Sequence, residues 1–249
     1  KHLVAYHRLR MVKEMSINPF DTQLGCRKPL PQDRAFLVNF LTLLATPVGE
    51  ERPYDGITDM AGLIVDEMYN EIKDDANPRK YTRNIEEVVD QKIDELKLQL
   101  DDKTSWWEVT DQLHKNGFSH VASIAQRYAM PLLADAASIC RSSTVEDLYG
   151  KIQAPTGEKL IDAFGRMISS AVREYPILSR ITAFDLGESK IVALDLDEVA
   201  KSIHPHKLVL VGKQITFNTL TKNLFDNENV IYLGPKSYKE LKNYISAAR

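Results

Sequence analysis

Residues 57–72 read ITDMAGLIVDEMYNEI, and this stretch decides which class of structure the chain can form. Its small and apolar side chains recur every three or four positions, at Ile57, Met60, Ala61, Ile64, Met68 and Ile72. That spacing places them on one stripe of an α-helix, with polar residues on the other faces. The stretch therefore predicts an amphipathic helix that buries one face.

The same residues also contain a second possible motif, GLIVDE, in which apolar residues lead into Asp66 and Glu67. Such a spelling is typical of a strand that holds magnesium in ATPases. The helical stripe, however, continues through Met68 and Ile72 beyond the two acids. We therefore interpret Asp66 and Glu67 as the solvated face of a helix.

Outward from this helix, nearly all of residues 31–176 has helical texture. Residues 32–45 predict a first helix, and residues 157–174 predict the last one. SWWE at 105–108 and STVE at 143–146 each have the spelling of a capping box. We expect Gly117 to end one helix, Met130-Pro131 to divide two others, and Trp106 and Trp107 to lie in the core.

The two ends of the chain have a different texture. Residues 2–11 predict a short strand, and Asn18-Pro19, Gly25 and two further prolines predict a loop up to position 31. Residues 180–196 read as two β-type runs that Gly187 joins as a hairpin. Beyond Lys201 the pattern alternates strand, helix, strand, helix, which favours a parallel-sheet unit.

The hairpin ends in IVALDLDEVA, residues 191–200, where an apolar run meets Asp195, Asp197 and Glu198. By spelling alone these three acids are candidates to face a nucleotide cleft and to hold magnesium. The alternative is a core strand with no catalytic role in this chain. We can assign no catalytic residue and no metal ligand from the sequence.

Composition bounds the possible functions. The chain has 249 residues, a net charge of −3 and a pI near 6.1, which disfavours a dominant nucleic-acid surface. Its apolar runs are too short to span a bilayer. Cys26 and Cys140 lie far apart, which favours reduced structural thiols. The first residue is lysine, so we expect the chain to be a fragment of a longer protein.

Several long blocks give the chain a resemblance to a known family. They include AYHRLRM, INPFDTQLGCRKPLPQDRAFLVNFLTLLATP, ERPYDGITDMAGLIVDEMY, AQRYAMPLLAD, PTGEKLIDAFGRMISSAVREYPILSR and FDLGESKIVALDLDEVA. In this order they closely resemble the inner-membrane-associated ATPases of Dot/Icm type IVB secretion systems and their relatives among conjugation ATPases. The resemblance covers about residues 1–201 and leaves 202–249 unmatched.

The resemblance implies an α/β fold with a dominant all-helical insertion: RecA-like core strands flank a helical subdomain. Residues 1–30 would be a core strand and loop, 31–180 the helical insertion, 181–201 a core β-hairpin and 202–249 a tail of separate or divergent origin. On this mapping the family's magnesium-holding strand lies downstream, so Asp195, Asp197 and Glu198 are not its acids.

The resemblance also implies the parent's biochemistry. An intact parent would hydrolyse ATP with Mg²⁺, form a hexamer, and sit in the cytoplasm against the bacterial inner membrane. It would energise assembly or substrate transfer and contact other secretion components. The printed sequence holds no G-x-x-x-x-G-K-[ST] loop, so we expect this chain alone to be inactive toward ATP.

Two other functions fit the residues. The first is a non-enzymatic helical module that docks a partner protein. The second is nucleic-acid binding, because HKNGFSHVASIAQRYAM resembles a helix-turn-helix with Gly117 at the turn and Gln126 and Arg127 on the second helix. The acidic net charge disfavours the second reading.

Overall fold

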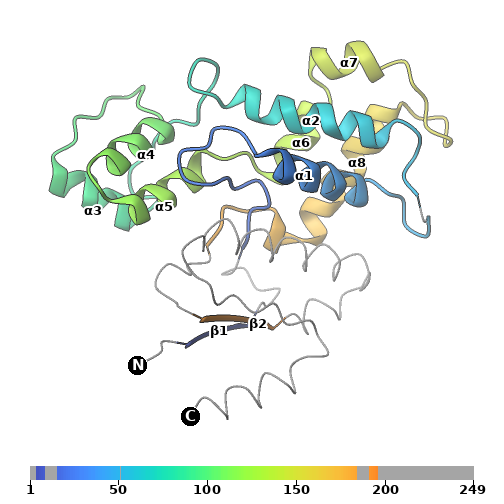
Figure 1. The fold of residues 1–249 in the computed structure, drawn as a ribbon. Helices are drawn as coiled ribbons and strands as arrows, with labels where there is room; N and C mark the ends of the chain where they lie inside the picture. Colours follow the sequence, from blue (N-terminus) through green and yellow to red (C-terminus); the bar gives the residue numbers. More distant parts are fainter. Residues whose placement is uncertain (1–3, 9–15, 51, 184–190, 196–249) are drawn as a thin grey trace.

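The computed structural model describes residues 4–8, 16–50, 52–183 and 191–195. Helices dominate this part of the chain (Figure 1). In chain order they are α1 (Pro31–Leu44), α2 (Ile57–Glu71), α3 (Glu87–Leu96), α4 (Trp106–Lys115), α5 (Ser119–Ala129), α6 (Leu133–Ile139), α7 (Ser143–Tyr149) and α8 (Leu160–Glu174), with a short 3-10 helix at Pro176–Leu178.

Helices α1, α2, α6, α7 and α8 pack together as the larger lobe. Every predicted stripe residue of α2 is buried, from Ile57 through Ile72, so the amphipathic helix is confirmed. Gly56 is the residue just before the helix, and its φ of +85° suits glycine. A larger residue at this position would place its Cβ 3.2 Å from Leu160 Cδ2. Phe164 on α8 is fully buried, and burial of such a side chain contributes about 1.5–3 kcal/mol.

Helices α3, α4 and α5 form the smaller lobe, at the left of Figure 1. The predicted capping box starts α4: Glu108 N donates to Ser105 Oγ at 3.1 Å, and Ser105 N donates to Glu108 Oε2 at 2.6 Å. Gly117 has a φ of +87° and turns the chain into α5, as predicted. A continuous cluster of buried apolar residues connects the two lobes.

Residues 16–30 form a loop that packs between the two lobes (Figure 1). The Phe20 ring is fully buried and meets Phe40 of α1 edge-on, with their centroids 6.2 Å apart. The Tyr69 hydroxyl of α2 donates to the Phe20 carbonyl at 2.6 Å. The loop predicted from Asn18-Pro19 and Gly25 is therefore confirmed, and it belongs to the interior of the helical body.

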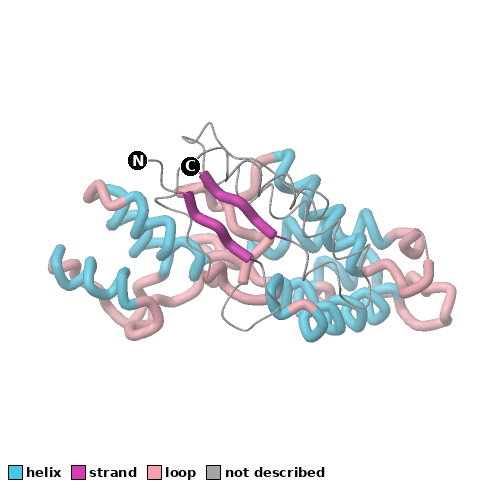
Figure 2. Tube along the Cα trace, turned by 90° about the horizontal axis from the view of Figure 1, so that it is seen from below, coloured by secondary structure: helices cyan, strands magenta, loops and turns pink. Residues whose placement is uncertain are grey.

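Strands β1 (Val4–Arg8) and β2 (Ile191–Asp195) lie side by side in parallel, below the helices in Figure 1 and in the foreground of Figure 2. Next to them, the segment that leads into the helices is hydrogen-bonded to the segment that leads out. We call this contact of residues 16–22 with 177–183 the neck. Ile17 N donates to Ile177 O at 2.7 Å, and Asn18 N donates to Thr182 Oγ1 at 2.7 Å.

The expected α/β class with RecA-like core strands is wrong for the described residues. They are predominantly helical, and the named strands among them are one five-residue pair, β1 and β2. The physical reason is that the helices bury their apolar stripes on one another, so their packing needs no sheet. The expectation of a sheet core came from the family resemblance together with the strand-like runs on either side of residues 31–180.

Two local predictions from the sequence are either wrong or fall outside the described residues. The cap of α7 is Ser142 rather than Ser143, and its Oγ accepts from Val145 N at 3.5 Å, so the STVE capping box is wrong by one residue. Residues 181–183 have no regular secondary structure, and the turn at Gly187 lies outside the described residues. The expected sheet unit after Lys201 also lies outside them.

Candidate functional site

The acidic strand end is the first candidate that the sequence singled out. Asp195 is the last residue of β2, and its backbone lies opposite that of Arg8 in β1. Asp197 and Glu198 lie outside the described residues. The possible cleft-facing role of the three acids therefore stays a prediction.

Asp66 and Glu67 of the GLIVDE motif lie on helix α2, as predicted. Arg34 of α1 donates to both carboxylate oxygens of Asp66, each at 2.6 Å, and this pairing raises the pKa of the Arg34 guanidinium. Glu67 accepts from the Asn70 side chain at 3.2 Å. In the structure, the Asp66 carboxylate links α1 to α2.

The nucleic-acid-binding hypothesis, based on a helix-turn-helix-like stretch, depended on Gln126 and Arg127 of α5. Gln126 is buried: its Nε2 donates to the Gln23 carbonyl at 2.9 Å, and its Oε1 accepts from Gly25 N at 2.7 Å. Arg127 donates to the Thr182 carbonyl in the neck at 3.3 Å. Gln126 is thus turned toward the 16–30 loop, where it cannot reach the edge of a base.

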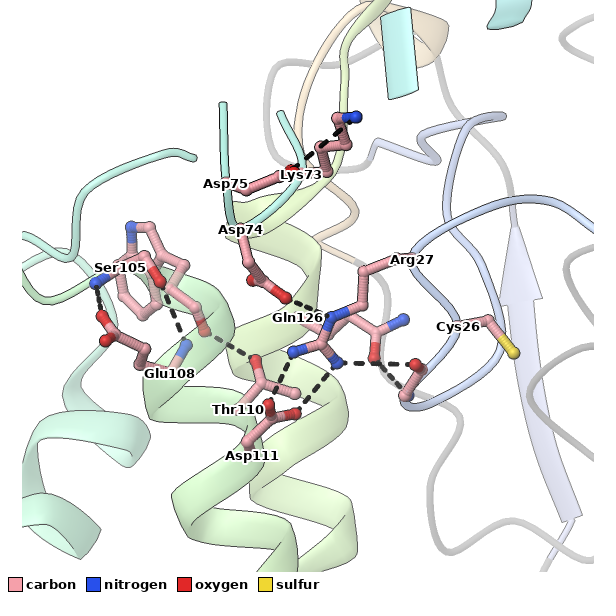
Figure 3. A network of polar contacts seen from close by, with 12 residues as sticks. Cys26, Arg27, Lys73, Asp74, Asp75, Ser105, Glu108, Thr110, Asp111 and Gln126 are labelled. Carbon is pink, nitrogen blue, oxygen red and sulfur yellow. Dashed lines mark hydrogen bonds and ion pairs between the residues drawn. The ribbon is translucent and has the colours of Figure 1, made fainter. Parts of the chain in front are cut away.

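Arg27 connects the 16–30 loop with the smaller lobe (Figure 3). It makes a two-pronged ion pair with Asp111 of α4, at 2.9 and 2.6 Å, and a further contact with Asp74 at 3.2 Å. Its guanidinium carbon lies 4.2 Å from the centroid of the Trp107 ring. The hydrogen bonds that Arg27 donates to Asp111 raise the pKa of the Arg27 guanidinium. This arrangement fixes the loop, as expected of a structural contact.

The two cysteines are free thiols. Cys140 is buried where α6 approaches α8, and a Cβ added at Gly165 would lie 3.1 Å from its Sγ. Burial raises the pKa of the Cys140 thiol to about 11, which keeps the sulfur protonated at neutral pH. Cys140 therefore acts as a small apolar side chain in the core, whereas Cys26 is partly exposed.

Two tryptophans were predicted to be core residues, and both are buried. Trp106 lies between two tyrosines of the smaller lobe: the Tyr128 ring stacks on it at 4.6 Å, and the Tyr81 ring meets its edge at 4.8 Å. The Tyr128 hydroxyl donates to Glu86 at 2.8 Å, and that of Tyr81 donates to Asp90. This aromatic cluster anchors the start of α3.

Exposed apolar side chains mark the surface that is best suited to contact another molecule. Ile85 and Val88, beside the aromatic cluster, are 50% and 47% exposed; Leu148 in α7 and Ile152 just after it are 64% and 39% exposed. The sequence reading did not single out Ile85 or Val88. The sequence did contain one indication of their exposure: neither residue falls on the stripe of Val89, Ile93 and Leu96 that forms the buried side of α3.

The part of the chain that the structure describes holds no cluster of three or more His, Cys, Asp or Glu side chains that could bind a metal ion. Within the same residues, none of the helices combines the length and the apolarity that crossing a bilayer requires.

We compared the chain with protein-family models, with curated proteins and with solved structures, and none of the three comparisons found a match. The family resemblance therefore rests on the sequence blocks alone.

Proposed function

We propose that this chain is the helical part of a type IV secretion or conjugation ATPase, similar to the Dot/Icm ATPase DotO (also called IcmB). In this proposal the helical body docks another protein of the secretion apparatus. The intact parent would use ATP and Mg²⁺ as a hexamer at the cytoplasmic side of the bacterial inner membrane.

The observation that best supports a docking role is the geometry of the neck. Ser16 Oγ donates to the Ile181 carbonyl at 2.6 Å, so the helical body begins and ends at one place. The exposed apolar residues Val88 and Leu148 lie on α3 and α7; in Figure 1, α7 is at the top of the helical body, away from the strands, and α3 is at its left end. A body attached at one end leaves its other surfaces accessible to a partner.

The resemblance supports the assignment to a secretion ATPase. A direct test is to crosslink the tagged chain in a bacterium that carries a type IVB secretion system, and to identify its partners by mass spectrometry. We expect secretion-system components to be recovered, and to disappear when the secretion genes are deleted. Recovery of an unchanged set of proteins from the deletion strain would contradict the assignment.

The alternative is a non-enzymatic helical interaction module that has no ATPase parent. Both readings predict that the chain alone does not bind ATP, because its sequence contains no phosphate-binding loop. Calorimetry with ATP and Mg²⁺ tests this prediction, and micromolar binding by the isolated chain would contradict it. Sequencing the gene upstream of residue 1 separates the two hypotheses, since only the first requires a phosphate-binding loop there.

A further inference from the structure

Helix α3 presents a mixed apolar and acidic surface to solvent. Its buried side consists of Val89, Asp90 and Ile93, which face the rest of the smaller lobe. On a helix of 3.6 residues per turn, the side opposite to these three carries four exposed residues, and the exposed Ile85 lies just before the helix, next to its N-cap Glu86. We call this surface the α3 face: Ile85, Glu87, Val88, Gln91 and Glu95.

The α3 face is held in place by interactions on its buried side. Asp90 accepts from the Tyr81 hydroxyl and, at 2.7 Å, from Asn84 N. Glu86, the residue between Ile85 and Glu87, accepts from Tyr128, which stacks on Trp106. The surface is therefore fixed before a partner arrives, and a fixed surface loses little conformational entropy on binding.

Charge determines which partner this surface fits. Two of the five residues of the α3 face, Glu87 and Glu95, are acidic and none is basic, and the neighbouring Asp94 is also exposed. The nearby ammonium of Lys92 is directed over the Phe118 ring, 4.3 Å from its centroid, and contacts Glu95 at 2.5 Å. Arg83 pairs with Asp94 at the edge. Glu87 accepts from the neutral amide of Gln91 at 2.9 Å.

We propose that the α3 face is a docking site for a basic amphipathic helix of a partner protein. Ile85 and Val88 would contact the partner's apolar side chains, and Glu87 would meet its lysines or arginines. Complementary charge of this kind orients the partner and increases the association rate more than the final affinity. This inference deepens the docking role proposed above, but it concerns only the chain's own surface.

The test uses the full chain and a designed probe. A fluorescein-labelled helical peptide of lysine and leucine is titrated with the chain, and binding is followed by fluorescence polarisation. We expect a Kd on the order of tens of micromolar, a value typical of a small apolar patch with charged neighbours. An otherwise identical peptide with glutamate in place of lysine should bind at least about tenfold more weakly.

Variants locate the binding site. Replacing both apolar residues, Ile85→Ser with Val88→Ser, should raise the Kd of the basic peptide at least about tenfold. Glu87→Gln should raise it about two- to fivefold and reduce its dependence on salt. Because the three side chains are exposed, the variants should keep the circular dichroism spectrum and unfolding midpoint of the parent chain.

The matched control is the exposed apolar pair of the larger lobe, Leu148→Ser with Ile152→Ser, which should change the Kd by less than about twofold. Three results would overturn the proposal: a Kd above about 1 mM, equal binding of the acidic peptide, or an equal loss in the Leu148 and Ile152 variant. Peptide binding without crosslinks to secretion components would keep the α3 face and reject the secretion assignment.

Discussion

The two lobes are stabilised by different interactions. The larger lobe buries aliphatic and phenylalanine side chains between long helices: Leu37 and Leu41 of α1, Ile64 of α2 and Phe164 of α8 are fully buried. The smaller lobe, built from three helices of 10 or 11 residues, relies on the Tyr81–Trp106–Tyr128 cluster, a capping box and ion pairs at its edges. The buried apolar contacts of the larger lobe do not titrate, although ion pairs such as Arg34–Asp66 also link its helices, whereas the aromatic cluster of the smaller lobe includes the titratable hydroxyls of Tyr81 and Tyr128.

The comparison indicates which helices can carry a binding surface without loss of stability. A helix whose buried side contributes only Val89, Asp90 and Ile93 still forms because aromatic rings and hydrogen bonds hold its first turn. The other side of α3 does not take part in packing, so its residues can contact a partner. In the larger lobe, α2 has eight buried residues, so most of its surface is committed to packing.

The largest effect should come from opening the larger lobe. Phe164→Ala removes a fully buried ring from α8 and should lower the free energy of unfolding by about 3–5 kcal/mol. Urea unfolding followed by circular dichroism measures this loss. The control is Leu148→Ala, at a 64% exposed position, which should stay within about 0.5 kcal/mol of the parent. A loss below about 1 kcal/mol for Phe164→Ala would contradict the packing described for this lobe.

A smaller effect should follow from releasing the loop between the lobes. Gln126→Leu leaves the Gly25 amide and two loop carbonyls without their partner and should cost about 2 kcal/mol. Hydrogen exchange should show the Gly25 amide becoming much less protected. The matched substitution Gln91→Leu, at an exposed position on α3, should cost less than about 0.5 kcal/mol. Equal costs would mean that Gln126 does not fix the loop.

The helix caps give a direct comparison between the lobes. Ser105→Ala removes the Oγ that accepts from Glu108 N in the capping box that starts α4 and should cost about 1 kcal/mol, while the backbone N of residue 105 can still donate to Glu108. Ser142→Ala in the larger lobe removes a single cap contact of 3.5 Å and should cost less. Thermal unfolding of the two variants side by side checks this order. The reverse order would show that the smaller lobe does not depend on its cap.

The smallest effect concerns alkaline pH. Burial, followed by the hydrogen bond to Asp90, raises the pKa of Tyr81 to about 12. Since a tyrosine in the unfolded chain has a pKa of about 10, the unfolded state loses its proton first as the pH rises. The free energy of unfolding should therefore fall between pH 10 and 12.

Tyr81→Phe should make that fall shallower, because the variant has one fewer hydroxyl to titrate. Urea unfolding at a series of pH values, with Tyr54→Phe as the control, separates this contribution from the other tyrosines. An identical slope in the parent and in Tyr81→Phe would show that the Tyr81 hydroxyl does not respond to the folded environment.

Much of the helical body could be predicted from local patterns. The stripe of α2, the capping box at Ser105, the turn at Gly117 and the break at Met130-Pro131 all depend on residues within one or two helical turns. These signals are local, and the structure confirms each of them. The cap of α7 was misplaced because Ser142 and Ser143 are adjacent, and only the backbone geometry decides which one accepts the hydrogen bond.

The rest depends on contacts between distant segments. No local pattern shows that Gln126 bonds residues about a hundred positions earlier, or that Asp111 pairs with Arg27. The α/β class was wrong for the described residues because the family resemblance and the strand-like runs near the two ends of the chain were given more weight than the helical periods of residues 31–176. The α3 face was missed because its two apolar residues stand out only once the buried side of α3 is known.

The neck has a consequence for chain entropy. Pairing β1 with β2 requires the chain to close a loop across residues 9–190. If that loop were a flexible coil, its closure would cost about 4–5 kcal/mol, which would oppose the pairing of two five-residue strands. The folded helical body instead brings Ser16 and Ile181 within one hydrogen bond of each other, at 2.6 Å. Folding of the helices thus shortens the effective connection between the strands to a few residues on each side.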